Sequence, residues 1–202
     1  MDYSFLSNNK VVPVVVINRL EDTESTISAL LEGGVNVAEI TFRTACAKDA
    51  IALAAKKFPT MMVGAGTVIN GKQCEEAIGA GAKFIVSPGF SDEVLAVANA
   101  HNIPYLPGVV TPTEVMRAIA AGLEVLKFFP AGVYGGIKAI KALSAAFPQV
   151  KFMPTGGVDL TNLADFLKLP CIVSVGGSFM FKGDRQDTIN KCREALKIVE
   201  EL

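Results

Sequence analysis

One lysine stands in the middle of an apolar segment, where its amine could act as a nucleophile. Residues 124–131 read Glu-Val-Leu-Lys-Phe-Phe-Pro-Ala, so Lys127 lies among side chains typical of a β-strand that ends at Pro130. Burial disfavours a charged ammonium, and a neutral amine attacks ketones to form a Schiff base. The alternative is that Lys127 lies at a strand end and extends its amine to water. The rest of the chain favours the nucleophile.

A carboxylate and a guanidinium suited to work beside such an amine come from an earlier segment. Glu39 alternates with apolar residues in the strand pattern of residues 35–42, so its side chain is expected to point inward. A buried carboxylate there could serve as general acid and base, the alternative being a structural ion pair with Arg43 or Lys127. Arg43 is predicted to grip a substrate carboxylate with two parallel hydrogen bonds, the alternative being a surface salt bridge.

Two glycine-rich turns predict a phosphate site. Thr155, Gly156 and Gly157 follow one strand pattern, and Gly176, Gly177 and Ser178 follow the next. Backbone N–H groups and a short helix N-terminus commonly hold phosphate at this place in an eight-stranded barrel. The alternative is that these glycines only shape tight turns.

A nucleotide site of the P-loop kind is excluded. Residues 66–72 match the spacing G-x-x-x-x-G-K, but Gln73 stands where a P-loop needs Ser or Thr to hold Mg²⁺. Ile69 likewise stands where a dinucleotide-binding fingerprint needs its third glycine.

Composition narrows the class of protein. Half of the 202 residues are hydrophobic, 19% are charged and the net charge is −1, so nucleic acid is not an expected partner. No apolar run reaches about 18 residues, and the first residues lack a signal-peptide order, so no membrane association is expected. The four cysteines are scattered without a C-x-x-C pair, and we expect them to be small core residues of a protein in a reducing cytoplasm. The single histidine leaves few ligands for a metal site.

Eight strand–helix units must position these residues. Strands are predicted at residues 11–17, 35–42, 61–64, 83–87, 103–106, 124–129, 150–154 and 171–175. Helices are predicted at residues 21–32, 45–58, 71–80, 91–100, 112–121, 137–147, 160–167 and 186–202. This alternation predicts an α/β fold, a closed parallel (β/α)₈ TIM barrel forming one domain over residues 1–202. The alternative is an open doubly wound sheet. In such a barrel the polar residues that follow the strands share the catalytic end.

Six segments together resemble one enzyme family. They are residues 38–44, 63–68, 86–89, 126–131, 154–157 and 176–178, which read AEITFRT, VGAGTV, VSPG, LKFFPA, PTGG and GGS. In this order they resemble the 2-keto-3-deoxy-6-phosphogluconate aldolases, also called 4-hydroxy-2-oxoglutarate aldolases, over essentially all the chain after Lys10. The resemblance implies a class I aldolase, usually a homotrimer, that needs no metal or other cofactor.

The resemblance also assigns roles. It implies that Lys127 is the Schiff-base lysine and that Glu39 shuttles protons through a water. The residues implied around the pyruvate-derived half are Arg43, Thr67 and Pro88, with Phe129 packed nearby and Thr155 near the reacting carbons. The residues implied to bind phosphate are Gly156, Gly157, Gly177 and Ser178, with Arg19 as a weaker match.

The implied reaction cleaves a phosphorylated 2-keto acid to pyruvate and glyceraldehyde 3-phosphate, with 4-hydroxy-2-oxoglutarate as a further substrate. The sequence leaves other functions open. The galactonate-derived epimer is one alternative main substrate. A phosphate-binding isomerase or synthase without a covalent intermediate is a second, and a silent binding protein is a third. The presence of both Glu39 and Lys127 argues against the third.

Overall fold

Strands and helices alternate along the chain, and the computed structural model describes all residues from 1 to 202. The strands are β1 Val11–Val15, β2 Val37–Thr41, β3 Met62–Gly66, β4 Ile85–Val86, β5 Tyr105–Leu106, β6 Gly108–Val109, β7 Val125–Phe128, β8 Lys151–Pro154 and β9 Val175–Gly177. The helices are α1 Ser4–Asn8, α2 Asp22–Glu32, α3 Ala47–Lys57, α4 Gly71–Gly79, α5 Asp92–Ala100, α6 Pro112–Ala120, α7 Gly136–Ala146, α8 Leu163–Leu167 and α9 Arg185–Glu200, with a short 3₁₀ helix, η1 Phe179–Phe181.

The strands pair in parallel, which confirms the α/β fold with a parallel sheet. Six strands form a half-barrel in the order β5-β4-β3-β2-β1-β9, and three form a second sheet in the order β6-β7-β8. The expected single closed sheet of eight strands is therefore present as two sheets with nine strands.

The extra strand arises at Pro107, directly after the expected fifth strand. β5 pairs with β4 before this proline, and β6 pairs with β7 after it. Proline has no backbone N–H, so the ladder is interrupted there. The Pro107 carbonyl still accepts a hydrogen bond from the Lys127 N–H at 2.9 Å. One short segment thus changes its partner strand and links the two sheets.

The eighth strand is displaced from its predicted position. Residues 171–174 make only a single bridge, between Phe152 and Ile172, and β9 begins at Val175. A further isolated bridge joins Thr155, just after β8, to Gly176 in β9. The second sheet therefore touches the first at both of its edges.

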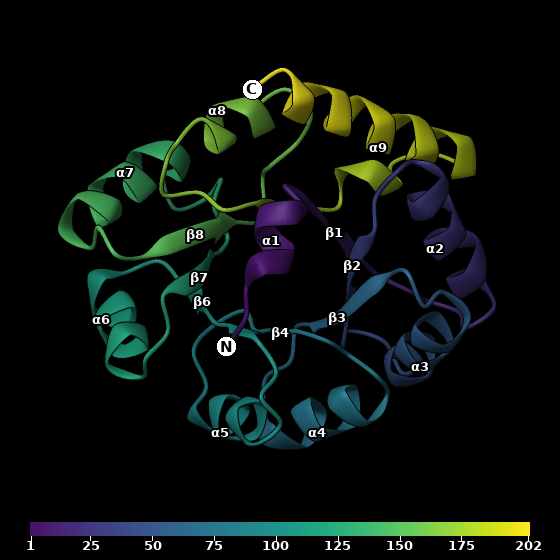
Figure 1. Ribbon diagram of the computed structural model, residues 1–202, viewed down its shortest axis with the longest axis horizontal. Coiled ribbons are helices and arrows are strands. Elements are labelled where there is room, and N and C mark those ends of the chain that lie inside the picture. Colours follow the sequence, from purple (N-terminus) through teal and green to yellow (C-terminus); the bar gives the residue numbers. More distant parts are fainter.

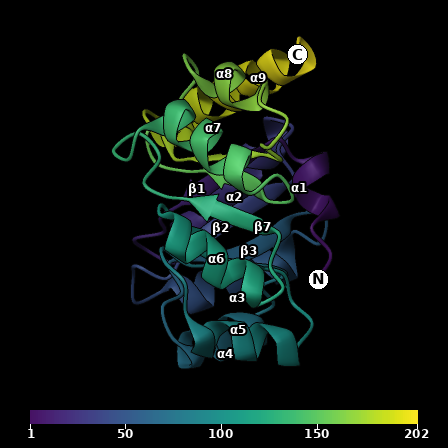
Figure 2. The ribbon, with the colours of Figure 1, turned by 90° about the vertical axis from the view of Figure 1, so that its left-hand side faces the viewer.

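Helices surround the strands, and α1 lies across one end of them (Figure 1). In the side view the strands run between α4 and α5 on one side and α8 and α9 on the other (Figure 2). The buried ring of Phe5 in α1 stacks on Phe84, with centroids 4.6 Å apart, and the Tyr3 hydroxyl donates to the Tyr105 carbonyl at 2.9 Å. Because Phe84 and Tyr105 stand where β4 and β5 begin, α1 covers the ends at which strands start.

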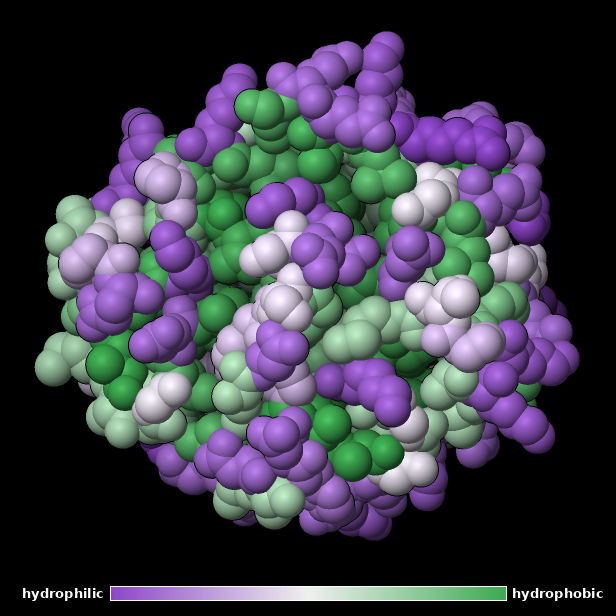
Figure 3. Space-filling model, viewed as in Figure 1, coloured by the Kyte–Doolittle hydropathy of each residue, from purple (hydrophilic) through white to green (hydrophobic).

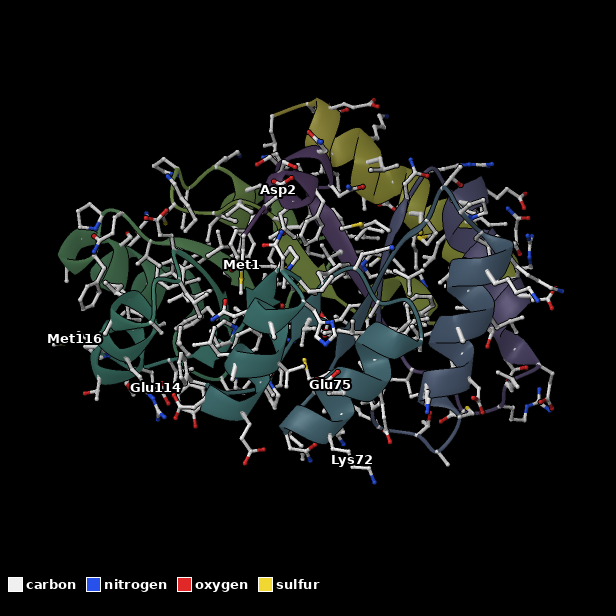
Figure 4. The ribbon with its side chains drawn as sticks, turned by 60° about the horizontal axis from the view of Figure 1, so that its bottom comes forward. Met1, Asp2, Lys72, Glu75, Glu114 and Met116 are labelled. Atoms are coloured by element: carbon white, nitrogen blue, oxygen red, sulfur yellow. The ribbon has the colours of Figure 1, made fainter.

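The outer helices divide into an apolar inner face and a polar outer face. In α4, Cys74 and Ala77 are buried, whereas Lys72 is exposed and projects outward (Figure 4). Hydrophilic residues accordingly cover much of the rim of the molecule (Figure 3). None of the helices combines the length and apolarity needed to span a bilayer.

Candidate active site

The two candidate catalytic side chains meet inside the ring of strands. Lys127 is the third residue of β7, and Glu39 is the third residue of β2. The Lys127 Nζ lies 3.3 Å from the Glu39 Oε1, and the two side chains are 4% and 0% exposed. Residues 88 positions apart in the chain therefore form a buried amine–carboxylate pair.

The buried pair leaves polar capacity unused beside it. Glu39 Oε2 and the Thr155 hydroxyl are both buried and have no hydrogen-bond partner within the protein. An unpaired buried polar atom costs about 1–3 kcal/mol, so native proteins keep few of them and those few call for an explanation. Groups that await a ligand or a water supply one.

Phe129 connects this pair to a cavity of about 270 Å³. Its ring lies 5.0 Å from the Lys127 Nζ, a cation–π distance, and the same residue lines the cavity. The other lining residues are Val14, Val16, Arg43, Thr155, Gly156, Gly157, Val158, Gly177 and Ser178. Seven of the predicted site residues thus surround one hollow.

The first glycine turn is held against the loop that follows the lysine strand. The Ala131 N–H donates to the Thr155 carbonyl at 2.9 Å, and the Gly132 N–H donates to the Gly156 carbonyl at 2.8 Å. Gly157 has a φ of +86°, and a Cβ built on it would lie 3.0 Å from the Gly132 Cα. Both the backbone conformation and the close approach therefore require glycine here.

The second glycine turn leads directly into a short helix. Gly177 ends β9, and the exposed Ser178 is the N-cap of η1 without a side-chain cap bond. The serine hydroxyl is therefore free to donate to a ligand in the cavity that it lines.

Arg43 lines the same cavity as the two glycine turns. Its Nε donates to the Thr67 hydroxyl at 3.1 Å, and no carboxylate pairs with it, so the alternative of a surface salt bridge is not what forms. Thr67 and the exposed Pro88 do not line the cavity. They follow β3 and β4 at the same end of the strands.

Arg19 is not brought to the cavity. Its side chain is 66% exposed, and its guanidinium lies 2.7 Å from Asp22 Oδ1 and 3.6 Å from Glu21 Oε1. This pair raises the pKa of Arg19, through the hydrogen bond to Asp22 before all else, and lowers the pKa of Asp22. An arginine three residues before an aspartate at a helix start can form an ion pair with that aspartate.

Sequence reasoning missed Val14 and Val16, which line the cavity from the end of β1. Their only sequence signal is an apolar strand, which carries no chemical signature. A larger hollow of about 540 Å³ shares Val14, Val16 and Ser178 and extends between α2 and the start of α9. Its charged lining residues are Asp22, Asp184 and Arg185, none of which is a predicted catalytic group.

The arrangement can carry out covalent chemistry on a carbonyl. A buried amine lies next to a carboxylate that can exchange protons, and the ring of Phe129 links the amine to a hollow with an arginine and two glycine turns. This combination suits an anionic keto compound better than a hydrophobic ligand.

Comparisons with known proteins find the same family over nearly the whole chain. The family model described as KDPG and KHG aldolase matches residues 3–194. The KHG/KDPG aldolase of Escherichia coli strain K12 is 44% identical over 200 residues, covering 96% of this chain and 94% of that relative.

Two solved structures share both fold and sequence. The 2-keto-3-deoxy-6-phosphogluconate aldolase of Zymomonas mobilis ZM4, solved with 3-phosphoglycerate, has a TM-score of 0.91 at 40% identity and covers 95% of this chain and 93% of that one. The KDPG aldolase of Legionella pneumophila, with pyruvate captured at low pH as a covalent carbinolamine intermediate, has a TM-score of 0.86 at 39% identity and covers 96% and 93%.

Proposed function

Since the chain belongs to the KDPG and KHG aldolase family, we propose that it is a class I aldolase, a lyase that cleaves 2-keto-3-deoxy-6-phosphogluconate to pyruvate and glyceraldehyde 3-phosphate. The observation that carries this proposal is the buried contact of 3.3 Å between Lys127 Nζ and Glu39 Oε1. A nucleophile and a proton acceptor at hydrogen-bond distance are the pair that Schiff-base chemistry requires.

The first half of the reaction forms the covalent intermediate. The neutral Lys127 amine attacks the C2 ketone and gives a carbinolamine, which loses water and becomes an iminium. The iminium withdraws electrons from C3, so the C3–C4 bond breaks once the C4 hydroxyl loses its proton. Glu39, acting through a water, accepts that proton, and glyceraldehyde 3-phosphate leaves.

The second half returns the enzyme to its starting state. The remaining enamine takes a proton at C3 from the same carboxylate and water, and the iminium is hydrolysed to pyruvate and the free lysine. The unpartnered Glu39 Oε2 supports this role, since it has an open acceptor position for a water. The covalent pyruvate intermediate of the Legionella relative supports the same chemistry.

Residues of the cavity, together with Thr67 and Pro88 at the same end of the strands, are proposed to hold the two ends of the substrate. Arg43, Thr67 and Pro88 surround the pyruvate-derived half, Phe129 packs beside it, and Thr155 lies near the reacting carbons. The phosphate is held at the far end by the two glycine turns, with residues Gly156, Gly157, Gly177 and Ser178. Arg19 can take part only if its pair with Asp22 opens.

A second substrate belongs to the proposal. The name of the Escherichia coli relative, KHG/KDPG aldolase, supports 4-hydroxy-2-oxoglutarate, which would give pyruvate and glyoxylate. This compound is one carbon shorter and ends in a carboxylate instead of a phosphorylated carbon, so it uses the same lysine and a different set of contacts at the far end.

The proposal includes the overall architecture. The two sheets, joined at Pro107 and at the Thr155–Gly176 bridge, support one closed (β/α)₈ barrel that forms a single domain over residues 1–202. A homotrimer is carried over from the family resemblance, and a measured mass of three chains in light scattering would support it. Four free cysteines support a reducing compartment, the cytoplasm.

Trapping of the intermediate tests the function. Borohydride reduces an iminium to a stable amine, so pyruvate with borohydride should add one reduced pyruvate to Lys127, as peptide mapping by mass spectrometry would show. Lys127→Ala should abolish the adduct, whereas Lys151→Ala, at an exposed lysine of the neighbouring strand β8, should keep it. An adduct on another lysine, or none in the wild type, would refute the proposal. Pyruvate release from the gluconate-derived, galactonate-derived and unphosphorylated substrates then identifies the preferred one.

A further inference from the structure

Gly66, the last residue of β3, lies directly beneath the carboxylate of Glu39. A Cβ built on Gly66 would lie 2.6 Å from the Glu39 Cγ and 2.7 Å from its Cδ, and it would overlap Oε1. Real side chains essentially never approach so closely. Oε1 is the oxygen that accepts the hydrogen bond from Lys127, so this glycine borders the reacting pair.

We infer that Gly66 is a positioning residue, whose missing side chain leaves the space in which the Glu39 carboxylate reaches Lys127. The inference rests on the proposed function, because the proposed function assigns the role of proton shuttle to Glu39. Gly66 does not touch the reacting atoms of the substrate and acts only through the position that it allows the Glu39 carboxylate to take.

Backbone conformation does not explain this glycine. Gly66 is absent from the glycines with positive φ, and it lies in a regular ladder in which its residue partner is Thr41. Its carbonyl accepts from the Phe42 N–H at 2.7 Å, as any strand residue could do. A glycine inside a strand weakens the strand and often marks a close approach of another group. Here the approaching group is the carboxylate of Glu39.

Gly64, two residues earlier in β3, provides a matched comparison. A Cβ at Gly64 would overlap the buried ring of Phe84, which itself stacks on Phe5. A ring packed on both sides has little freedom to move, whereas the carboxylate of Glu39 is the end of a flexible side chain. An added methyl group should therefore disturb packing at position 64 and displace the carboxylate at position 66.

The test compares Gly66→Ala with Gly64→Ala. For Gly66→Ala we expect pyruvate to be trapped on Lys127 by borohydride, a melting temperature near that of the wild type, and turnover lower by about 10², the usual scale for a catalytic group displaced by about 1 Å. The exchange of pyruvate C3 protons with D₂O, which needs the lysine adduct and the proton shuttle, should fall by a similar factor. Gly64→Ala should lower the melting temperature more and the exchange rate less.

A double-variant cycle separates action through Glu39 from a general effect. If Gly66 acts only through Glu39, Gly66→Ala should reduce exchange little further in a Glu39→Gln background, because groups that act as one unit are not additive. A full additional loss, or wild-type turnover and exchange in Gly66→Ala, would overturn the inference.

A folding failure would also decide the matter. If Gly66→Ala does not fold, Glu39→Ala is added to it, which removes the atoms that the new methyl group overlaps. Recovery of the fold supports the inference, and continued failure overturns it. Absence of trapping in the wild type would instead refute the proposed function, and the positioning role with it.

Discussion

The side chain of Thr155 lies against the backbone of Gly176, on the neighbouring strand β9, and its hydroxyl has no hydrogen-bond partner. A Cβ on Gly176 would overlap that hydroxyl and lie 3.2 Å from both carbons of the threonine side chain beyond Cα. Thr155 is 4% exposed. The protein thus buries a hydroxyl at the edge of the cavity and offers it no protein partner.

Thr155→Val should therefore separate stability from activity. Valine has the same shape and removes an unsatisfied hydroxyl, so the free energy of unfolding should stay level or rise by about 1–3 kcal/mol. If the hydroxyl contacts the substrate, kcat/KM should fall by roughly tenfold or more, the worth of one hydrogen bond to a ligand. Urea unfolding and steady-state kinetics check both. Thr188→Val, at a buried threonine of α9 whose hydroxyl donates to the Asp184 backbone carbonyl, is the control and should lose stability without losing activity.

Local patterns in the sequence were sufficient for the alternation of strands and helices and for the strand settings of Lys127 and Glu39. They left the contact of Glu39 with Lys127 as one of two possible ion pairs, the other being with Arg43, because it depends on how strands 88 residues apart lie relative to each other. The prediction that the two glycine turns lie at the same end of the barrel rests on the general rule that the ends of parallel strands share one face.

Several features of the structure have no signal in the local sequence pattern. The helix α1 has only five residues, too few for a periodic pattern, although Phe5 and Leu6 are buried. Arg19 stays a predicted phosphate contact, and its pair with Asp22 at the start of α2 is a feature that the strand and glycine patterns did not indicate. The place of Gly66 beneath Glu39 depends on a neighbour across the sheet, which no local spacing reveals.

Glu39→Gln should lower turnover by roughly 10²–10⁴, the usual worth of general acid–base catalysis. Glutamine keeps the size of the side chain and can still accept a hydrogen bond from Lys127, but it cannot take up the substrate's proton. Circular dichroism should show the wild-type fold, and stopped assays at saturating substrate give the turnover. Near-normal turnover would show that Glu39 is not the base. An unfolded variant would favour the purely structural ion pair.

The cysteines should fall into two reactivity classes. Burial raises the pKa of the Cys74 and Cys192 thiols to about 11, with the charge of Glu75 adding to the effect at Cys74. The thiolate is the reactive form, and only about one thiol in a thousand is ionised three pH units below its pKa. Iodoacetamide near pH 8 should therefore modify the partly exposed Cys46 and Cys171 first, and the other two after denaturation. Equal rates at all four, measured peptide by peptide, would contradict the buried setting.

Activity should survive prolonged treatment with EDTA. The proposed iminium provides the electron withdrawal that a metal-dependent aldolase obtains from its ion. No three His, Cys, Asp or Glu side chains lie close enough together to hold a metal, and the single histidine, His101, pairs with Glu75 on the surface at 2.9 Å. The measurement is kcat/KM before and after chelation, with metal content determined in parallel. Loss of activity that returns with Zn²⁺, Mg²⁺ or Mn²⁺ would refute the expectation.

Ser178→Ala should lower kcat/KM for the phosphorylated substrate more than for the unphosphorylated one. The hydroxyl of Ser178 lines the cavity as the N-cap of η1 and forms no bond within the protein, so its removal leaves the fold unchanged. One hydrogen bond to a charged acceptor contributes about 1.5–3 kcal/mol, a loss of roughly one to two powers of ten in kcat/KM. The same change should affect 4-hydroxy-2-oxoglutarate less, because its far end carries no phosphate.

Arg19→Ala is the matched comparison for the proposed phosphate site. The Arg19 guanidinium pairs with Asp22 and lies outside the cavity. The kcat/KM of the phosphorylated substrate divided by that of 4-hydroxy-2-oxoglutarate should therefore stay at the wild-type value in Arg19→Ala. Ser178→Ala should lower that ratio, since only the phosphorylated compound loses a contact. The opposite pattern would be a constant ratio in Ser178→Ala and a reduced ratio in Arg19→Ala. It would show that the phosphate binds at the loop after β1 and not at the turn before η1. It would also require the Arg19–Asp22 pair to open when substrate binds, which rising salt would then promote by screening an exposed pair.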